Sequence, residues 1–211
     1  MALAVDSYEL GPIGTNCYIV RADRAGAEAV VIDPGAEAER LRAELAGMGA
    51  RCAAILITHG HWDHLGGVAD LAEATGAPVH MAEDERTLLE DINSFTPSSF
   101  ELRPYTPDVL LRGDEVLELA GISFATLRVP GHSPAHLAYH ADDCLFSGDL
   151  VFAGSVGRTD LPGADWDTLV ESVRMLADRF PPETIVYPGH GPKTTLGAEV
   201  GGNPFLAELR A

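Results

Sequence analysis

Residues 58–67 read THGHWDHLGG and directly follow the apolar run 53–57. Within six positions this segment contains His59, His61, Asp63 and His64. Imidazole and carboxylate are ligands that suit zinc or iron, and a strand before the loop would hold the loop rigid. Because a loop can turn neighbouring side chains apart, we expect His59 and His61 to converge on one ion while Asp63 and His64 turn toward a second. The alternative is a histidine-rich turn exposed to solvent, and distant ligands would decide between the two.

Three further apolar runs are each followed by a candidate ligand that has a glycine directly before it. The runs and their ligands are 124–129 with His132, 145–147 with Asp149, and 185–187 with His190. Glycine permits the tight turns that bring backbone close to bound ions. If these strands are neighbours in a sheet, their ends converge and complete a set of seven ligands. Seven ligands suffice for two metal sites that share one carboxylate and leave positions open for water and substrate.

The composition indicates a folded, strongly acidic protein. A chain of 211 residues can bury a substantial core, and we expect one domain spanning residues 1–211. The formal net charge is −18, and Lys193 is the single lysine. This charge argues against binding to nucleic acid or to an anionic membrane, and it is also what a well-solvated surface would give.

The cysteines and the N-terminal sequence favour a cytoplasmic protein. Cys17, Cys52 and Cys144 are odd in number, far apart and surrounded by apolar residues, which is typical of buried free thiols in a reducing compartment. The first ten residues lack a basic segment followed by a long apolar run. No stretch approaches the roughly 20 apolar residues that a membrane span requires. We expect a monomer or a small homo-oligomer that binds a small molecule.

Apolar periodicity and turn residues predict alternating strands and helices. Strands are expected at 5–10, 16–20, 29–32, 78–81, 116–119, 122–129, 137–139, 144–147 and 184–187, and helices at 37–48, 65–74, 83–92, from Asp165 to before Pro181, and from Pro204. Residues 93–108 contain three prolines and no clear period, which predicts a long loop. Such a loop is either a lid over a site or a surface excursion.

With these ligands in place, the chain resembles the metallo-β-lactamase superfamily, whose HxHxDH loop, distant His, distant Asp and final His match the seven candidates. The resemblance implies an α/β (α+β) fold, an αββα sandwich with the site along one edge between two sheets. It assigns His59, His61 and His132 to the first ion, Asp63, His64 and His190 to the second, and Asp149 to a bridge between them. Asp33 resembles the buried aspartate that braces the ligand loop in this family, although Asp-Pro-Gly at 33–35 is also an ordinary turn.

Two stretches are similar to the glyoxalase II branch, in its short single-domain form. They are GSVGRTD at 154–160 and PGHGPKTTLG at 188–197, followed by Glu199 and by Asn-Pro-Phe at 203–205. The branch hydrolyses 2-hydroxyacyl (lactoyl-type) thioesters of glutathione. Arg158 lies where longer members place a basic residue that meets glutathione, or it pairs with Asp160 on the surface. Longer members have a C-terminal helical domain that binds the thiol carrier, so another small thiol remains an alternative to glutathione.

The resemblance implies hydrolysis with two divalent metal ions, zinc first, with iron or manganese as alternatives. A hydroxide that bridges the ions would attack the thioester carbonyl, and Asp63 would orient it as well as bind metal. The alternative activity is a persulfide dioxygenase, which uses one iron held by two histidines and one aspartate. A catalytically inactive binding relative is the non-enzyme alternative. The lack of an export signal disfavours a β-lactamase, and the charge disfavours a nuclease.

Overall fold

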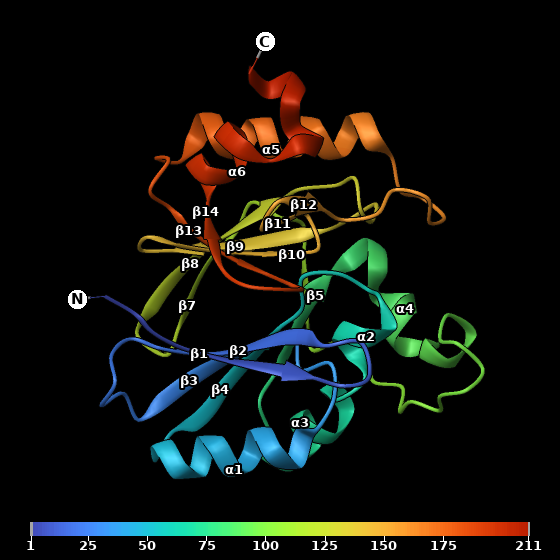
Figure 1. The fold of residues 1–211 in the computed structure, drawn as a ribbon. Helices are drawn as coiled ribbons and strands as arrows, with labels where there is room; N and C mark the ends of the chain where they lie inside the picture. Colours follow the sequence, from blue (N-terminus) through green and yellow to red (C-terminus); the bar gives the residue numbers. More distant parts are fainter. Residues whose placement is uncertain (1, 211) are drawn as a thin grey trace.

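Two six-stranded β-sheets face each other at the centre of the molecule, and helices cover the outer face of each sheet (Figure 1). The computed structural model describes residues 2–210. Two sheets between two helical layers form the αββα sandwich that the resemblance implies, so the predicted α/β fold class is confirmed.

The first sheet is built by the N-terminal half of the chain. Its first three strands are antiparallel and its remaining neighbours are parallel, so helical crossovers connect the parallel strands. The ligand-rich segment 58–67 follows a parallel strand, β4. In spatial order the strands are β1 (Ala4–Leu10), β2 (Thr15–Arg21), β3 (Glu28–Ile32), β4 (Arg51–Leu56), β5 (Val79–Ala82) and β6 (Val109–Leu111).

The second sheet is built by the C-terminal half. Its strands are antiparallel except for β10 and β13, which are parallel neighbours. In spatial order they are β14 (Thr194–Thr195), β13 (Ile185–Pro188), β10 (Cys144–Gly148), β9 (Leu137–Ala141), β8 (Ile122–Arg128) and β7 (Val116–Leu119). A short hairpin, β11 (Val151–Phe152) and β12 (Ser155–Val156), follows β10.

Three apolar layers hold the sandwich together. Successive residues of a strand face opposite sides of its sheet, so on β4 Ile55 packs toward the outer helices and Leu56 packs between the sheets. Leu41 joins the outer cluster of the first sheet, and Phe124 joins the cluster between the sheets. Leu169 packs in the outer cluster of the second sheet. Alternation along the strands therefore fixes which residues face the partner sheet.

Two long helices agree with the sequence-based expectation. Helix α1 (Ala38–Met48) covers the first sheet and α5 (Trp166–Arg179) covers the second (Figure 1). The Asp165 side chain accepts a hydrogen bond from the backbone N–H of Thr168 at 2.8 Å, which is the predicted N-cap of α5. Near the C-terminal end, α6 (Leu196–Gly202) was not predicted and η3 (Pro204–Arg210) was.

The prediction of one helix at 65–74 is wrong at the start of that helix. The structure contains α2 (Trp62–Leu65) and, separately, α3 (Val68–Thr75). A Cβ atom on Gly66 would lie 2.5 Å from the carbonyl oxygen of Gly35, and one on Gly67 would lie 2.7 Å from that of Pro34. The glycines therefore separate the helices because the chain passes against the backbone that follows β3.

The segment after β5 forms short helical pieces, and residues 95–108 beyond it form a loop without helices or strands. The predicted helix 83–92 is split into η1 (Glu83–Glu85), α4 (Arg86–Glu90) and the start of η2 (Ile92–Ser94). In the loop, the ring of Phe100 stacks on Trp62 at 4.9 Å between centroids. Asn93 exchanges two 2.8 Å hydrogen bonds with the backbone of Leu102. These contacts fasten the loop beside the ligand-rich segment.

The structure also bears on the cysteines and on membrane insertion. Cys17, Cys52 and Cys144 are buried, and none of them forms a disulfide in the part of the chain described. Within residues 2–210, no helix combines the length and the apolar character needed to cross a membrane.

Candidate metal centre

All seven candidate ligands meet at one edge of the sandwich. Two come from loops that follow β10 and β13, which are neighbours as expected. The loop after β8 is separated from them by β9, and β4 belongs to the other sheet. The strands are therefore not all neighbours in one sheet, and the ligands converge across the gap between the two sheets. The convergent residues are His59, His61, Asp63, His64, His132, Asp149 and His190.

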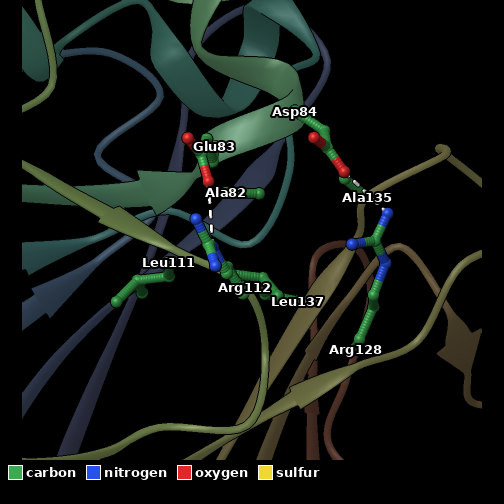
Figure 2. A pocket seen from close by; sticks show the side chains of 8 residues that line it. All are labelled: Ala82, Glu83, Asp84, Leu111, Arg112, Arg128, Ala135 and Leu137. Carbon is green, nitrogen blue, oxygen red and sulfur yellow. Dashed lines mark hydrogen bonds and ion pairs between the residues drawn. The ribbon is translucent and has the colours of Figure 1, made fainter.

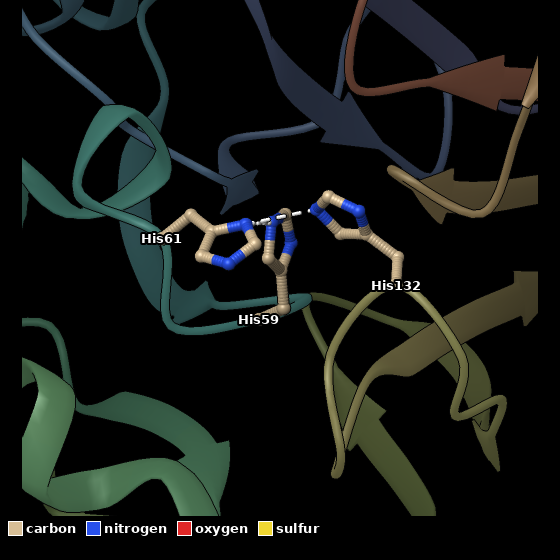
Figure 3. A group of neighbouring side chains, drawn as sticks. All are labelled: His59, His61 and His132. Carbon is tan, nitrogen blue, oxygen red and sulfur yellow. Dashed lines mark hydrogen bonds between the residues drawn. The ribbon is translucent and has the colours of Figure 1, made fainter. Parts of the chain in front are cut away.

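Three imidazoles form the first group. Nδ1 of His61 lies 3.0 Å from Nε2 of His59 and 2.8 Å from Nε2 of His132, and the rings point toward one another (Figure 3). Burial, with the neighbouring imidazoles, holds the pKa of His59 well below its usual range and lowers that of His61 to about 4. Both rings are therefore neutral near pH 7, which is the form that binds a metal ion.

Two carboxylates and two imidazoles form the second group. Nε2 of His64 lies 3.4 Å from Asp63 Oδ2 and 3.4 Å from Asp149 Oδ1, and Nε2 of His190 lies 3.3 Å from Asp63 Oδ2. Asp149 Oδ2 lies 3.5 Å from Nε2 of His190 and 3.5 Å from Nε2 of His132, which belongs to the first group. Asp149 therefore contacts both groups.

Charge is concentrated in the second group. Burial raises the pKa of Asp63, but hydrogen bonding to His190 and the charge on His64 outweigh it and bring the value to about 2. Burial lowers the pKa of His64, but Asp149 and Asp33 outweigh it and hold the value well above the usual range. The pKa of His190 is raised in the same way by Asp63. The raised pKa values favour the protonated imidazoles, and a divalent cation bound there would replace those protons.

Unsatisfied atoms at the centre of the cluster fit a cation. Nε2 of His64 and Oδ1 of Asp149 are buried and lie 3.4 Å apart without the geometry of a hydrogen bond, and neither atom has a hydrogen-bond partner within the described residues. Buried polar atoms normally have a partner, and a metal ion would serve both. A Cβ on Gly189 would lie 2.0 Å from Asp149 Oδ1, so only glycine leaves room there. These atoms and the other His and Asp donors of the cluster are of the types that bind divalent metal ions, so the cluster fits a metal-binding site.

A second set of hydrogen bonds orients the imidazoles. The carboxylate of Asp33 accepts from the backbone N–H of Thr58 at 2.8 Å, from the Thr58 hydroxyl at 2.7 Å and from Nδ1 of His64 at 2.9 Å. The Thr58 hydroxyl in turn lies 3.0 Å from Nδ1 of His59. Nδ1 of His132 lies 2.9 Å from the carbonyl oxygen of Arg158. These contacts leave the Nε2 atoms directed into the cluster, the arrangement typical of metal-ligating histidines.

Two buried side chains that support the cluster were not found from the sequence. The carboxylate of Glu85 accepts from the backbone N–H of Gly60 at 2.6 Å and from that of Ala135 at 2.9 Å, which joins the first ligand loop to the segment after His132. The hydroxyl of Thr15 donates to Asp63 Oδ2 at 2.7 Å. Neither residue belongs to a pattern that marks it in the sequence, because Glu85 ends an acidic run at 83–85 and Thr15 starts an ordinary strand.

The cluster opens into a cleft of about 850 Å³. Residues 94–97 form part of its wall, so the 93–108 loop borders the site. Arg158 also lines the cleft, and its guanidinium donates two hydrogen bonds to Asp160 at 2.7 and 2.8 Å. The surface pairing that the sequence left as an alternative is thus the arrangement in this structure.

A second cavity, of about 290 Å³, lies beside η1 and β8. Its two arginines are already paired, Arg112 with Glu83 at 3.1 Å and Arg128 with Asp84 at 2.9 Å (Figure 2). No member of the seven-residue cluster lines it. The larger cleft is therefore the candidate substrate site.

Comparisons with known proteins agree with this geometry. Hydroxyacylglutathione hydrolase GloC of Haemophilus influenzae is 34% identical over 197 residues, covering 90% of this chain and 92% of the relative. The crystal structure of TTHA1623 in a di-iron-bound form is 43% identical with a TM-score of 0.86, covering 96% of this chain and 100% of that one. The crystal structure of BLEG-1, a B3 metallo-beta-lactamase, is 38% identical with a TM-score of 0.90, covering 97% and 100%. Residues 10–190 match the family model of the metallo-beta-lactamase superfamily. The chain belongs to the metallo-β-lactamase superfamily.

Proposed function

We propose that this protein is a binuclear metallohydrolase that cleaves 2-hydroxyacyl thioesters of glutathione or of another small thiol. The observation that carries the proposal is the pair of ligand groups, joined through Asp149 and open to the large cleft. The similarity to GloC supports a hydroxyacyl thioester as the substrate class. The di-iron form of TTHA1623 supports two ions, and zinc remains our first choice over iron or manganese.

In this proposal each ligand group holds one ion. His59, His61 and His132 would hold the first, Asp63, His64 and His190 would hold the second, and Asp149, which contacts both groups, would serve both. Such ions would supply a water that is nucleophilic near neutral pH and a positive charge that polarises the substrate carbonyl.

The chain's own residues position the reactants. Asp63 is ionised, since its pKa is about 2, and can accept a hydrogen bond from the attacking water while it binds metal. The Thr15 hydroxyl fixes the carboxylate of Asp63 by donating a 2.7 Å hydrogen bond to its Oδ2 atom. Asp33 fixes His64, and Thr58 fixes His59. Because these supports are buried, the site is organised before substrate binds.

Two other activities are alternatives to thioester hydrolysis at this site. A persulfide dioxygenase would hold one iron by two histidines and one aspartate, and the Pro-Gly-His-Gly-Pro-Lys-Thr-Thr stretch at 188–195 supports the hydrolase over it. The likeness to BLEG-1 makes β-lactam hydrolysis a second candidate. The formal charge of −18 supports a small-molecule substrate over nucleic acid or an anionic membrane, and the three buried free cysteines support a cytoplasmic location.

The test is a substrate panel on protein of known metal content. We expect turnover of a lactoyl thioester, and neither oxygen uptake with a persulfide nor opening of a β-lactam at a comparable rate. His59→Ala and Asp63→Ala should fold normally by circular dichroism and lose thioester turnover by orders of magnitude. His140→Ala is the matched control, because the His140 ring stacks on Phe180 at 4.1 Å outside the cluster. Near-normal turnover in either ligand variant would contradict the proposal.

A further inference from the structure

The wall of the large cleft is apolar beyond the metal cluster. Four of the apolar side chains that line it come from separate parts of the chain: Ile13 between β1 and β2, Leu88 on α4, Phe95 after η2, and Phe152 on β11. Ile13 and Phe95 are 53% and 54% exposed, although large apolar side chains normally gain by burial. Single exposed apolar residues are ordinary, but these two line one cleft that leads to the candidate metal centre. An apolar lining with a few convergent polar groups is typical of a small-molecule site, and such a lining buries an apolar group at lower cost than a charged group that finds no partner.

Free charge is scarce on the same wall. Apart from members of the cluster, Arg158 is the single charged side chain among the described residues that line the cleft. Asp160 occupies its guanidinium with two hydrogen bonds, so the pair carries no net charge. Glutathione has two carboxylates and one ammonium group. The wall contains no unpaired side chain, within residues 2–210, that would match either charge.

The net charge of the whole protein also disfavours an anionic ligand such as glutathione. The formal net charge is −18, and two divalent ions would offset only four of these charges. A strongly negative protein slows the approach of a negatively charged ligand, whereas a neutral ligand is unaffected.

We propose that the thiol carrier of the substrate is uncharged and apolar, and that its chain lies along the wall formed by Ile13, Leu88, Phe95 and Phe152. This inference rests on the proposed thioester hydrolysis and names the leaving group that the site selects. In the reaction, water forms the new C–O bond and the C–S bond breaks with its electron pair on sulfur. The products are the carboxylate, the thiol and one proton.

The first test uses lactoyl thioesters that share one acyl group and differ only in the thiol. The thiols are glutathione, N-acetylcysteamine, which is neutral and polar, butanethiol and hexanethiol. We expect kcat/KM to rise in that order, by about two- to fourfold for each methylene between butyl and hexyl, because burying one methylene favours binding by about 0.8 kcal/mol. A higher kcat/KM for the glutathione thioester than for the butyl thioester would overturn the inference and leave the proposed function standing. Hydrolysis of none of the four would contradict the proposed function, and the inference with it.

The second test asks whether the side chains of this wall cause the preference for an apolar thiol. Phe95→Ala should lower kcat/KM for the hexyl thioester about fivefold and flatten its dependence on chain length, since part of the buried contact is lost. Ile13→Ala should act in the same direction. Phe205→Ala is the matched control, because Phe205 is 48% exposed and does not line the cleft. An unchanged chain-length dependence in both Phe95→Ala and Ile13→Ala would overturn the placement of the thiol on this wall.

Discussion

Replacing Glu85 by glutamine should lower the stability of the protein and its metal affinity, although Glu85 is not itself one of the candidate ligands. The buried carboxylate accepts one hydrogen bond from Gly60, between two ligands, and one from Ala135, beyond a third. A glutamine oxygen can keep one of these bonds, but its amide group would face the other N–H as a second donor. Leaving a buried donor unsatisfied costs about 1–3 kcal/mol, which for a domain of this size lowers Tm by roughly 2–12 °C. Loss of support behind metal ligands typically lowers metal affinity about 10–100-fold.

The assay compares Glu85→Gln with Glu83→Gln, a substitution two positions away in the same acidic run, residues 83–85. Glu83 pairs with Arg112 at 3.1 Å near the surface, and such pairs contribute about 0–1 kcal/mol (Figure 2). Metal-free protein would be unfolded with urea, and zinc affinity would be measured by competition with a chromophoric chelator. If the two variants match in both stability and zinc affinity, Glu85 does not join the ligand loops as the structure indicates.

Three further predictions concern the second ligand group and the sheet edge. Thr15→Val should fold normally and lower thioester turnover about 10–100-fold, because Asp63 loses the hydroxyl that orients it; unchanged turnover would count against this role. Zinc binding to metal-free protein near pH 7 should release protons from His64 and His190, because the pKa values of both are raised. Calorimetry in buffers of different ionisation enthalpy measures this release, and equal heats of zinc binding in those buffers would contradict it. Burial opposes ionisation of Glu115, but backbone N–H donors outweigh it and lower its pKa to about 2. Its stabilisation is therefore present above about pH 4.5 and lost as the pH falls toward 2, so the Tm difference between wild type and Glu115→Gln should shrink over that range, and a constant difference would refute it.

The sequence predicts the ligand set because the chemistry is local. His59, His61, Asp63 and His64 stand in one short loop, and His132 and His190 each follow an apolar run and a glycine. Such patterns survive in any fold that places strand ends together. The N-cap at Asp165 is predictable for the same reason, since its partner Thr168 lies three residues away.

Features that depend on distant contacts are not readable in this way. Glu83 and Glu85 look alike in the sequence, and only the fold buries Glu85 against Gly60. The break between α2 and α3 arises because Gly66 passes close to the backbone of Gly35, which is remote in sequence. Whether a strand joins one sheet or the other is likewise set by pairing rather than by its own residues. The sequence therefore predicts that the ligands converge, and the structure shows that they come from both sheets.

The proposed chemistry depends most directly on how many ions the cluster binds and on which residues hold them. The decisive measurement is a crystal structure of protein purified without added metal, with anomalous scattering recorded at the zinc and iron edges and metal content measured on the same sample. We expect two ions per chain, one among His59, His61 and His132 and one among Asp63, His64 and His190, with Asp149 between them. A single ion, or ions bound away from these residues, would contradict the account.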